Sequence, residues 1–419
     1  RYQIERIVLP AGEIDDEGRL PLRSVKQCSA CGYLHPYDGT AGPDVCERCS
    51  AELPAPITGL LRMQNVITRR RERISSDEEE RQRFGYEVRT AVRFAEGGSR
   101  PGATSAEVTV DGQPWARLTY GDAATIWRIN LGWRRRADQS RYGYVLDTET
   151  GRWLEESALE DADDSLPSAD TARRAERVVP YVDDWRNALV VDPAEPLDLP
   201  LHASLTAALK SAIQAEFQLE DDELAAEPLP TEEDRRSILL YEAAEGGAGV
   251  LRRLVEEPDA LPRVARRALE LCHVDPDTGA DLRRAPGARQ DCEAVCYDCL
   301  MSYRNQRDHR HLDRKLLVPV LQDLCRAAVA TSPSTSPRAE EIARLKQACD
   351  SDLEREWIDL LVRLDAALPT HAQKLIDFCQ ARPDFLYGPD YTAVFIDGPH
   401  HDAPGQRQRD GEIDACLAD

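Results

Sequence analysis

The stretch Leu271–Lys315 reads LCHVDPDTGADLRRAPGARQDCEAVCYDCLMSYRNQRDHRHLDRK and decides how the rest of the chain is interpreted. Its four cysteines are Cys272, Cys292, Cys296 and Cys299. Three of them lie within eight residues, a spacing that lets a short loop wrap one metal ion while a more distant thiolate completes a tetrahedron. Zinc is the ion that such a set of thiolates favours, so we expect a structural zinc site here.

A dense polar string follows the last of these cysteines. The candidate nucleic-acid contacts in it are Arg304, Asn305, Gln306, Arg307, His309 and Arg314. Such side chains can reach phosphates and base edges, so the string is predicted to contact DNA. The alternative is an ordinary helix surface whose arginines pair with Asp308 and Asp313. His273, His309 and His311 are alternative zinc ligands, although the four-cysteine set is complete without them.

A second cysteine cluster lies near the start of the chain, in two Cys-x-x-Cys knuckles. Its members are Cys28, Cys31, Cys46 and Cys49. Paired knuckles at this separation are typical of a zinc ribbon, in which each knuckle supplies two thiolates and Gly32 allows a tight turn. Ribbons of this kind usually close a small domain that cannot bury a core by itself.

Composition limits the class of protein. The chain has 419 residues, which suggests roughly three domains, and it contains no apolar run long enough for a membrane span. Eight of its twelve cysteines fall in the two clusters, which favours a reducing compartment. We therefore expect a cytoplasmic protein with no membrane partner. Because the first residue is Arg1, we also expect the chain to be a piece of something larger.

The net charge of −23 by itself argues against a nucleic-acid partner, but arginines cluster locally. One cluster comprises Arg69, Arg70, Arg71 and Arg73, and another follows Trp133 as Arg134–Arg136. The first cluster could bind phosphates or neutralise the acids of 77–80. The second is a basic cluster or a solvated strand end. The segments 155–180 and 220–236 are rich in acids and proline, so they are predicted to be flexible surface segments.

The predicted fold class is a multidomain α+β protein. We expect a zinc ribbon over 1–60, a mixed α/β region with a small antiparallel sheet over 61–200, and a helical zinc-binding domain over 201–330. A linker and helix occupy 331–350, and a truncated nuclease-like α/β domain occupies 351–419. Helical spacing predicts a helix over 201–218. The glycine-rich turn at 246–249 lacks the Gly-Lys-Ser/Thr of a Walker A loop, so no ATPase is expected in this chain.

The run YEAAEGGAGVL, the helix after it and the cysteine block with SYRNQRDHRHLDR resemble the MrfA-type zinc-binding (MZB) domain of superfamily 2 helicases. The resemblance covers roughly 1–330. It implies a zinc-stabilised, DNA-handling region beside a DNA-translocating motor, which lies either upstream on the same polypeptide or on a separate subunit. Relatives occur in anti-phage systems such as DISARM and Druantia, which implies further defence-system subunits as partners.

The carboxyl-terminal region combines a helix that begins at Ser351 with a predicted hairpin. Asp384 opens one strand of the hairpin and Asp397 closes the other, so antiparallel pairing places the two carboxylates at the same end. With Glu354 from the helix they form a hard-oxygen site for Mg²⁺ or Mn²⁺.

This arrangement resembles PD-(D/E)XK nucleases of the very-short-patch-repair type. The resemblance implies that Glu354, Asp384 and Asp397 serve the metal, that His400 moves a proton or orients water, and that the reaction is DNA phosphodiester hydrolysis. The chain departs from the pattern because no lysine follows Asp397 closely and the later strands of the fold are missing. The alternative function is a non-catalytic zinc scaffold that clamps DNA and its motor, with an inactive nuclease remnant. An RNA-directed zinc-ribbon protein is a further alternative.

Overall fold

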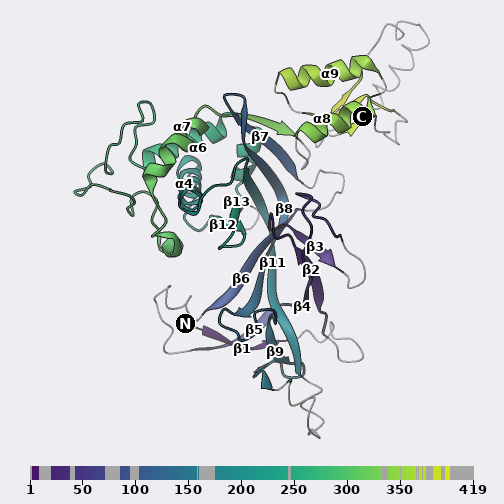
Figure 1. Cartoon of the computed structure of the whole chain (residues 1–419), viewed down its shortest axis with the longest axis vertical. Helices are drawn as coiled ribbons and strands as arrows, with labels where there is room; N and C mark the ends of the chain where they lie inside the picture. Colours follow the sequence, from purple (N-terminus) through teal and green to yellow (C-terminus); the bar gives the residue numbers. More distant parts are fainter. Residues whose placement is uncertain are drawn as a thin grey trace.

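The computed structural model describes most of the chain (Figure 1). The described residues are 2–8, 20–37, 43–70, 85–94, 103–157, 159, 175–243, 247–332, 338–349, 351–364, 366, 368–369, 371–373, 381–387 and 392–396. Among these residues, no helix combines the length and apolar character needed to cross a lipid bilayer.

Two very long strands form the axis of the molecule. Strand β8 (Gln113–Trp133) and strand β11 (Ala175–Pro193) pair antiparallel, with Tyr181 opposite Ile129 at one end and Pro193 opposite Ala116 at the other. Strand β11 has two runs of consecutive buried residues, 178–181 and 188–191, and β8 has a similar run at 118–121. Both faces of the sheet are therefore covered at these positions. A register shift between Arg186 and Ala188 marks a bulge about halfway along the pair.

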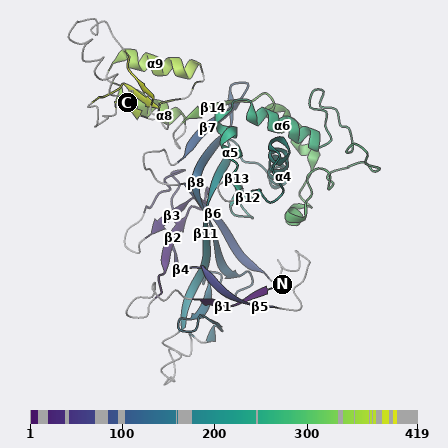
Figure 2. The ribbon, with the colours of Figure 1, turned by 180° about the vertical axis from the view of Figure 1, so that it is seen from behind.

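The other strands of the twelve-stranded sheet attach to this pair. They are β2 (Arg23–Gln27), β3 (Leu34–Tyr37), β4 (Ile57–Arg62), β6 (Tyr86–Arg93), β7 (Thr104–Val110), β9 (Tyr144–Asp147), β10 (Trp153–Leu154), β12 (Leu224–Pro230), β13 (Arg235–Glu242) and β14 (Ala328–Ser332). A separate two-stranded ribbon joins β1 (Tyr2–Val8) to β5 (Asn65–Arg70). It lies at the far end of the sheet from β14 (Figure 2).

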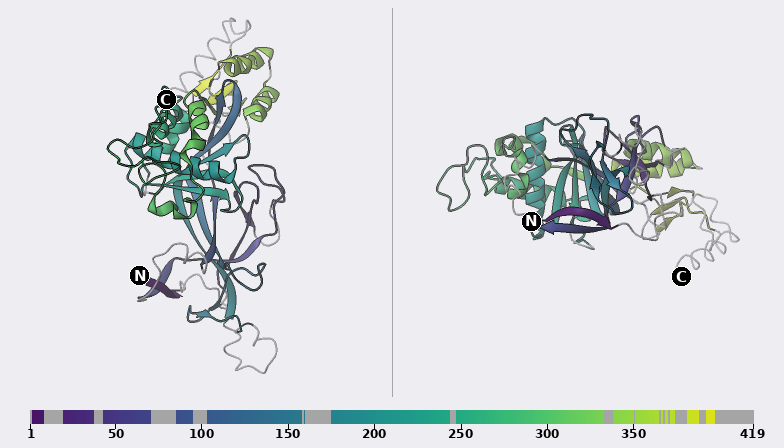
Figure 3. Two further views of the ribbon diagram at one scale, coloured as in Figure 1. Left: turned by 60° about the vertical axis from the view of Figure 1, so that its left-hand side comes forward. Right: turned by 90° about the horizontal axis from the view of Figure 1, so that it is seen from below.

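Helices cover one side of the sheet at the end where β7 and β13 lie, and strands β2 and β3 lie along the other side (Figures 1 and 3). The helices are α4 (Leu199–Phe217), α5 (Val250–Glu256), α6 (Ala260–Leu271) and α7 (Leu317–Leu324). Helix α4 confirms the predicted helix: the Asp198 side chain accepts a hydrogen bond from Leu201 N at 2.9 Å and so caps its first turn.

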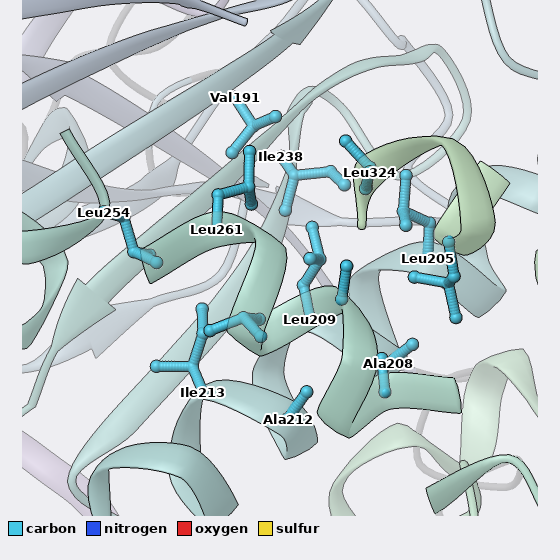
Figure 4. Packing of buried hydrophobic residues seen from close by; sticks show 14 of the residues in the cluster. Val191, Leu205, Ala208, Leu209, Ala212, Ile213, Ile238, Leu254, Leu261 and Leu324 are labelled. Carbon is cyan, nitrogen blue, oxygen red and sulfur yellow. The ribbon is translucent and has the colours of Figure 1, made fainter. Parts of the chain in front are cut away.

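The main core lies between these helices and the sheet (Figure 4). Leu205, Leu209 and Ile213 of α4 are fully buried against Ile238 of β13 and Leu261 of α6. Burying a side chain of this size contributes about 1.5–3 kcal/mol, so the α4 stripe alone accounts for much of the docking of this layer.

The described part of the glycine-rich turn, from Gly247 onward, lies against a carboxylate of strand β13. The buried Glu242 accepts hydrogen bonds from Gly249 N at 3.0 Å and Leu251 N at 3.1 Å, and Asn187 donates to it at 2.9 Å. A Cβ on Gly247 would lie 2.1 Å from Glu242 Oε2, which explains the need for glycine there. Packing within the chain therefore accounts for this turn.

Several sequence-based expectations are corrected by the sheet. The antiparallel region is large, not small, and it crosses the predicted boundaries at 60 and 200 because strands from 23–332 pair within it. The acid-rich segment 220–236 holds strand β12 and the start of β13, so it is not a flexible surface segment throughout. Thr331 and Ser332 end strand β14, so ordered structure continues into the predicted linker.

The carboxyl-terminal region has its own small core. Its elements are α8 (Arg338–Ala348), α9 (Asp352–Arg363), β15 (His371–Ala372), β16 (Phe385–Tyr387) and β17 (Thr392–Val394). Leu345, Ile358 and Phe385 meet in this core. The predicted hairpin is present, with Phe385 opposite Val394. The Arg71 and Arg73 positions and the predicted helix start at Ser75 lie outside the described residues.

A buried histidine makes the stability of the helical layer depend on pH. His202 of α4 is fully buried, with Nε2 3.3 Å from Ser237 O, and burial lowers its pKa from 6.5 to about 4. The unfolded chain binds the proton of His202 more tightly than the folded chain does. The contribution of neutral His202 to the unfolding free energy is therefore fully present above pH 6.5 and falls as the pH drops toward 4.

We expect His202→Gln to remove part of this pH dependence. Between pH 7.5 and 5.5 the wild-type protein should lose about 1.4 kcal/mol more unfolding free energy than the variant. Denaturant unfolding of both zinc-loaded proteins at the two pH values measures the difference. An equal loss in the two proteins would show that His202 is not held neutral by burial.

Candidate metal centres and nucleic-acid surface

The amino-terminal cluster brings together all four predicted cysteines. Cys28 and Cys49 have their Sγ atoms 3.6 Å apart, as do Cys31 and Cys46, and the four sulfurs lie within 4.8 Å of one another. A tetrahedral zinc ion with Zn–S bonds of about 2.3 Å separates its sulfurs by about 3.8 Å, so this set fits zinc.

Local backbone geometry and a buried histidine support this cluster. Gly32 adopts a φ of 73°, and a Cβ there would lie 2.9 Å from Leu229 Cδ2, so the glycine lets the first knuckle pack against β12. His35 is fully buried, with Nε2 3.3 Å from Cys46 Sγ. A ring N–H at that place would donate to the sulfur of a zinc-bound Cys46 and orient it. Arg48 anchors the second knuckle through a 3.2 Å hydrogen bond to Asp192 of β11.

The second cluster differs from the predicted set in one member. Cys292, Cys296 and Cys299 gather as expected, with 3.9 Å between the first and last sulfurs and 3.6 Å between the last two. The fourth donor is His273, whose Nε2 lies 3.2 Å from Cys296 Sγ. Cys272 instead packs in the main core. The four-cysteine prediction is therefore corrected to three cysteines and one histidine, which also fits zinc.

The way helix α6 ends explains the exchange of Cys272 for His273. His273 has a φ of 59°, and its N–H bonds to Glu270 O while Val274 N bonds to Leu269 O. These are the two hydrogen bonds of a Schellman motif, which reverses the chain at a left-handed residue. The reversal leaves Cys272 on the core side, where burial raises the pKa of its thiol to about 12.

The predicted DNA-contacting string is largely engaged with the rest of the protein. Arg314 is 1% exposed and donates to Asp281 at 2.8 and 3.0 Å, to Cys272 O at 3.1 Å and to Cys292 O at 2.7 Å. It therefore joins the end of α6 to the metal loop and is not available to DNA. The expectation for Arg314 is corrected for this reason.

The side chains of Asn305 and His309 also bond to nearby residues of the same loop. The Asn305 side chain accepts a 2.7 Å hydrogen bond from Ser302 N and donates to Leu300 O, capping the 3₁₀ helix η1 (Tyr303–Asp308). His309 Nε2 lies 3.0 Å from Ser302 O. Among the described residues, no metal-binding group of three or more donors includes His309 or His311.

The remaining predicted contacts lie nearer the surface. Arg304 pairs with Asp221 at 3.3 Å, Arg307 pairs with Glu232, and Gln306 is half-buried. Asp308 and Asp313 are the partners that the sequence suggests for the arginines of the string, and the structure shows other partners for both. Asp308 binds Arg235 at 2.7 Å, and Asp313 caps the next 3₁₀ helix, η2 (Arg314–Leu316).

Two of the four predicted nuclease residues lie within the described part of the chain, and they converge. Glu354, in the first turn of α9, is 5% exposed, and Asp384 precedes β16. Gln373 Nε2 donates to Glu354 Oε2 at 3.0 Å and to Asp384 Oδ1 at 2.9 Å. Asp397 and His400 lie outside the described residues.

Other hydrogen bonds orient the same two carboxylates. Ile396 N donates to Asp384 Oδ2 at 2.6 Å, and the Ser351 hydroxyl lies 2.6 Å from Glu354 Oε1. Gln373 was not identified from the sequence, because no local pattern distinguishes it from any other surface glutamine.

Comparison with known families supports the zinc assignment. Residues 205–300 match the MrfA Zn-binding domain family. The chain carries an MrfA-type zinc-binding domain. The match includes His273, Cys292, Cys296 and Cys299, the residues that the structure brings together.

Among solved structures, the chain is similar to a crystal structure of the DUF1998 helicase MrfA bound to DNA, at 10% identity and a TM-score of 0.31. The similarity covers 57% of this chain and 25% of that helicase, so the chain spans about a quarter of the helicase. No curated protein matches the chain.

Adjacent substitutions test the ligand set of the MrfA-type zinc-binding domain. We expect the wild-type protein to hold about two zinc ions, His273→Ala to lose the second of them, and Cys272→Ala to keep both. Metal analysis after dialysis against a weak chelator measures the stoichiometry. If Cys272→Ala loses one zinc and His273→Ala loses none, the assignment is wrong.

Proposed function

We propose that this chain is the DNA-handling part of a helicase-based anti-phage defence assembly, and that its carboxyl-terminal region hydrolyses DNA phosphodiesters with Mg²⁺ or Mn²⁺. The observation that carries the cleavage proposal is the convergence of Glu354 and Asp384 on Gln373. The association with DNA and a superfamily 2 motor is supported by the MrfA-type zinc-binding domain and by the resemblance of the flanking sequence.

The carboxylate pair supplies the ligands that hard divalent cations prefer. The amide of Gln373 donates to both carboxylates, so a cation entering between them would take over the interaction that this amide provides. A bound cation would polarise a phosphodiester oxygen and lower the pKa of an attacking water. Asp397 is proposed as a further carboxylate ligand, and His400 as the group that orients or deprotonates the water.

One observation favours a second function. Gln373 donates a hydrogen bond to each carboxylate, and the Ser351 hydroxyl bonds to the other oxygen of Glu354, so the group also forms a structural hydrogen-bond network. A chain that kept this network only for packing would be a non-catalytic zinc scaffold that clamps DNA and its motor. The two functions differ in whether DNA is cut.

Conservative substitutions separate these functions. We expect Asp384→Asn and Glu354→Gln each to lower Mg²⁺-dependent plasmid cleavage by at least about 100-fold, because each removes a charged metal ligand. Asp359→Asn is the matched control, since Asp359 lies in the same helix and pairs only with Lys346 among the described residues. Cleavage should be followed with the motor present and absent. No metal-dependent cleavage by the wild-type protein under either condition would leave the scaffold function.

Two arginines of the polar string should behave differently in DNA binding. Arg307→Ala should weaken binding and reduce the slope of log affinity against log salt by about 1, while zinc content stays unchanged. Arg314→Ala should release zinc from the His273 cluster or lower the melting temperature, because Arg314 supports that metal loop. Equal effects of the two variants on zinc content would contradict the division of roles.

A further inference from the structure

Four aromatic side chains form a continuous row at the lower end of the long sheet. Tyr86 of β6 and Trp133 of β8 are register partners with ring centroids 4.5 Å apart. Tyr144 of β9 lies 6.1 Å from Tyr86 and 6.5 Å from Trp133, and Trp153 of β10 lies 5.5 Å from Tyr144. The row therefore joins four strands of the sheet.

Within the part of the chain that the structure describes, side chains on this face of the sheet are exposed where the row reaches it. Trp133 is 49% exposed and Tyr86 is 45% exposed, and Val88 and Val182 on the same face are 44% and 43% exposed. The pairing register places Val88 opposite Asn130, which bonds to the Tyr144 hydroxyl at 3.0 Å. Exposed apolar side chains grouped in this way mark an interaction surface more often than an ordinary solvated surface.

The opposite face provides an internal comparison. There, Trp127 and Tyr181 stack at 4.4 Å with an angle of 10° between their planes, and both are buried in a core. The chain thus already has a closed aromatic stack for stability on that side. The Tyr86–Trp133 pair contributes less to a core, so its exposure calls for another explanation.

Charge around the row favours an anionic partner. Although the whole chain carries a net charge of −23, residues 128–152 contain six arginines and three carboxylates. Four of these arginines pair with carboxylates: Arg128 with Glu227, Arg134 with Glu232, Arg136 with Glu87 and Arg141 with Asp138. Ion pairs as exposed as Arg134–Glu232 contribute little, so a phosphate can replace the carboxylate there. Arg134 follows Trp133 directly and reaches Glu232 at 3.1 Å, and the same carboxylate pairs with Arg307 of η1. The aromatic row is therefore connected to the polar string of the zinc-binding domain.

We infer that the exposed end of the aromatic row, Tyr86 and Trp133, binds single-stranded nucleic acid by base stacking. The arginines after Trp133 would attract the phosphate backbone. Aromatic side chains beside a basic strip are how single strands are bound without sequence preference, since every base has a stacking face. In duplex DNA the base faces are stacked on one another, so they cannot meet Tyr86 or Trp133. The inference rests on the proposed DNA-handling function and names the strand state that this surface prefers.

Fluorescence anisotropy with the full zinc-loaded chain tests this inference. The probes are a labelled oligothymidylate of about 15 nucleotides, the matching oligouridylate and the corresponding duplex. We expect Tyr86→Ala/Trp133→Ala to weaken single-strand binding at least about tenfold, while Trp133→Phe retains most of it. Oligouridylate bound as tightly as oligothymidylate would assign the surface to single strands of either sugar type.

Trp185→Ala is the matched control, because Trp185 is 75% exposed but its register partner Thr125 places it on the opposite face of the sheet. Circular dichroism and zinc content confirm that each variant folds. Equal single-strand affinity in the wild type and the double variant, or equal weakening by Trp185→Ala, would overturn the inference. Duplex binding without single-strand binding would overturn it while the DNA-handling function stands. No binding to any nucleic acid would overturn both.

Discussion

The antiparallel pairing of β8 and β11 is the constraint on which the rest of the structure depends. Along its length the pair supplies side chains to successive cores, with Val191 packed under the helices, Ile126 behind the zinc ribbon and Ile129 in the lower sheet. Because strand side chains alternate between two faces, a slip of one residue would move each side chain to the opposite face and out of its own core. The helical zinc domain, the zinc ribbon and the aromatic row therefore keep their relative positions only while this register is maintained.

Buried arginines attach each of the two metal loops to the rest of the protein. Arg48 joins the second knuckle of the amino-terminal cluster to Asp192 of β11, and Arg314 joins the loop of the His273 cluster to Asp281 and to the end of α6. A buried guanidinium keeps its charge, so removing its carboxylate partner is costly, and each pair favours one arrangement of its loop. Metal binding adds free energy to the same arrangement. These arginines therefore stabilise the two metal loops and do not contribute to a DNA-binding surface.

The parts of the structure that follow from local sequence were predictable. The spacing of Cys28, Cys31, Cys46 and Cys49 was sufficient to identify the first metal site, and the apolar periodicity of 201–218 identified helix α4. The exchange of Cys272 for His273 was not predictable, because it depends on the residue at which α6 ends. Arg314 looked like a surface residue because its burial arises only from tertiary contacts.

Long-range pairing was also hidden from the sequence. Alternation in 106–150 indicated strands, but it could not show that β8 would pair with a strand as distant as β11 or that 224–230 would join the same sheet.

The central claim is that DNA is held as a single strand along β6 and β8, beside the zinc domain. Photo-crosslinking of an iododeoxyuridine-containing single strand to the full chain, followed by peptide mapping, tests this claim most directly. The account predicts crosslinks at Tyr86 or Trp133, whereas crosslinks confined to other regions, or none above a heparin-competed background, would contradict it.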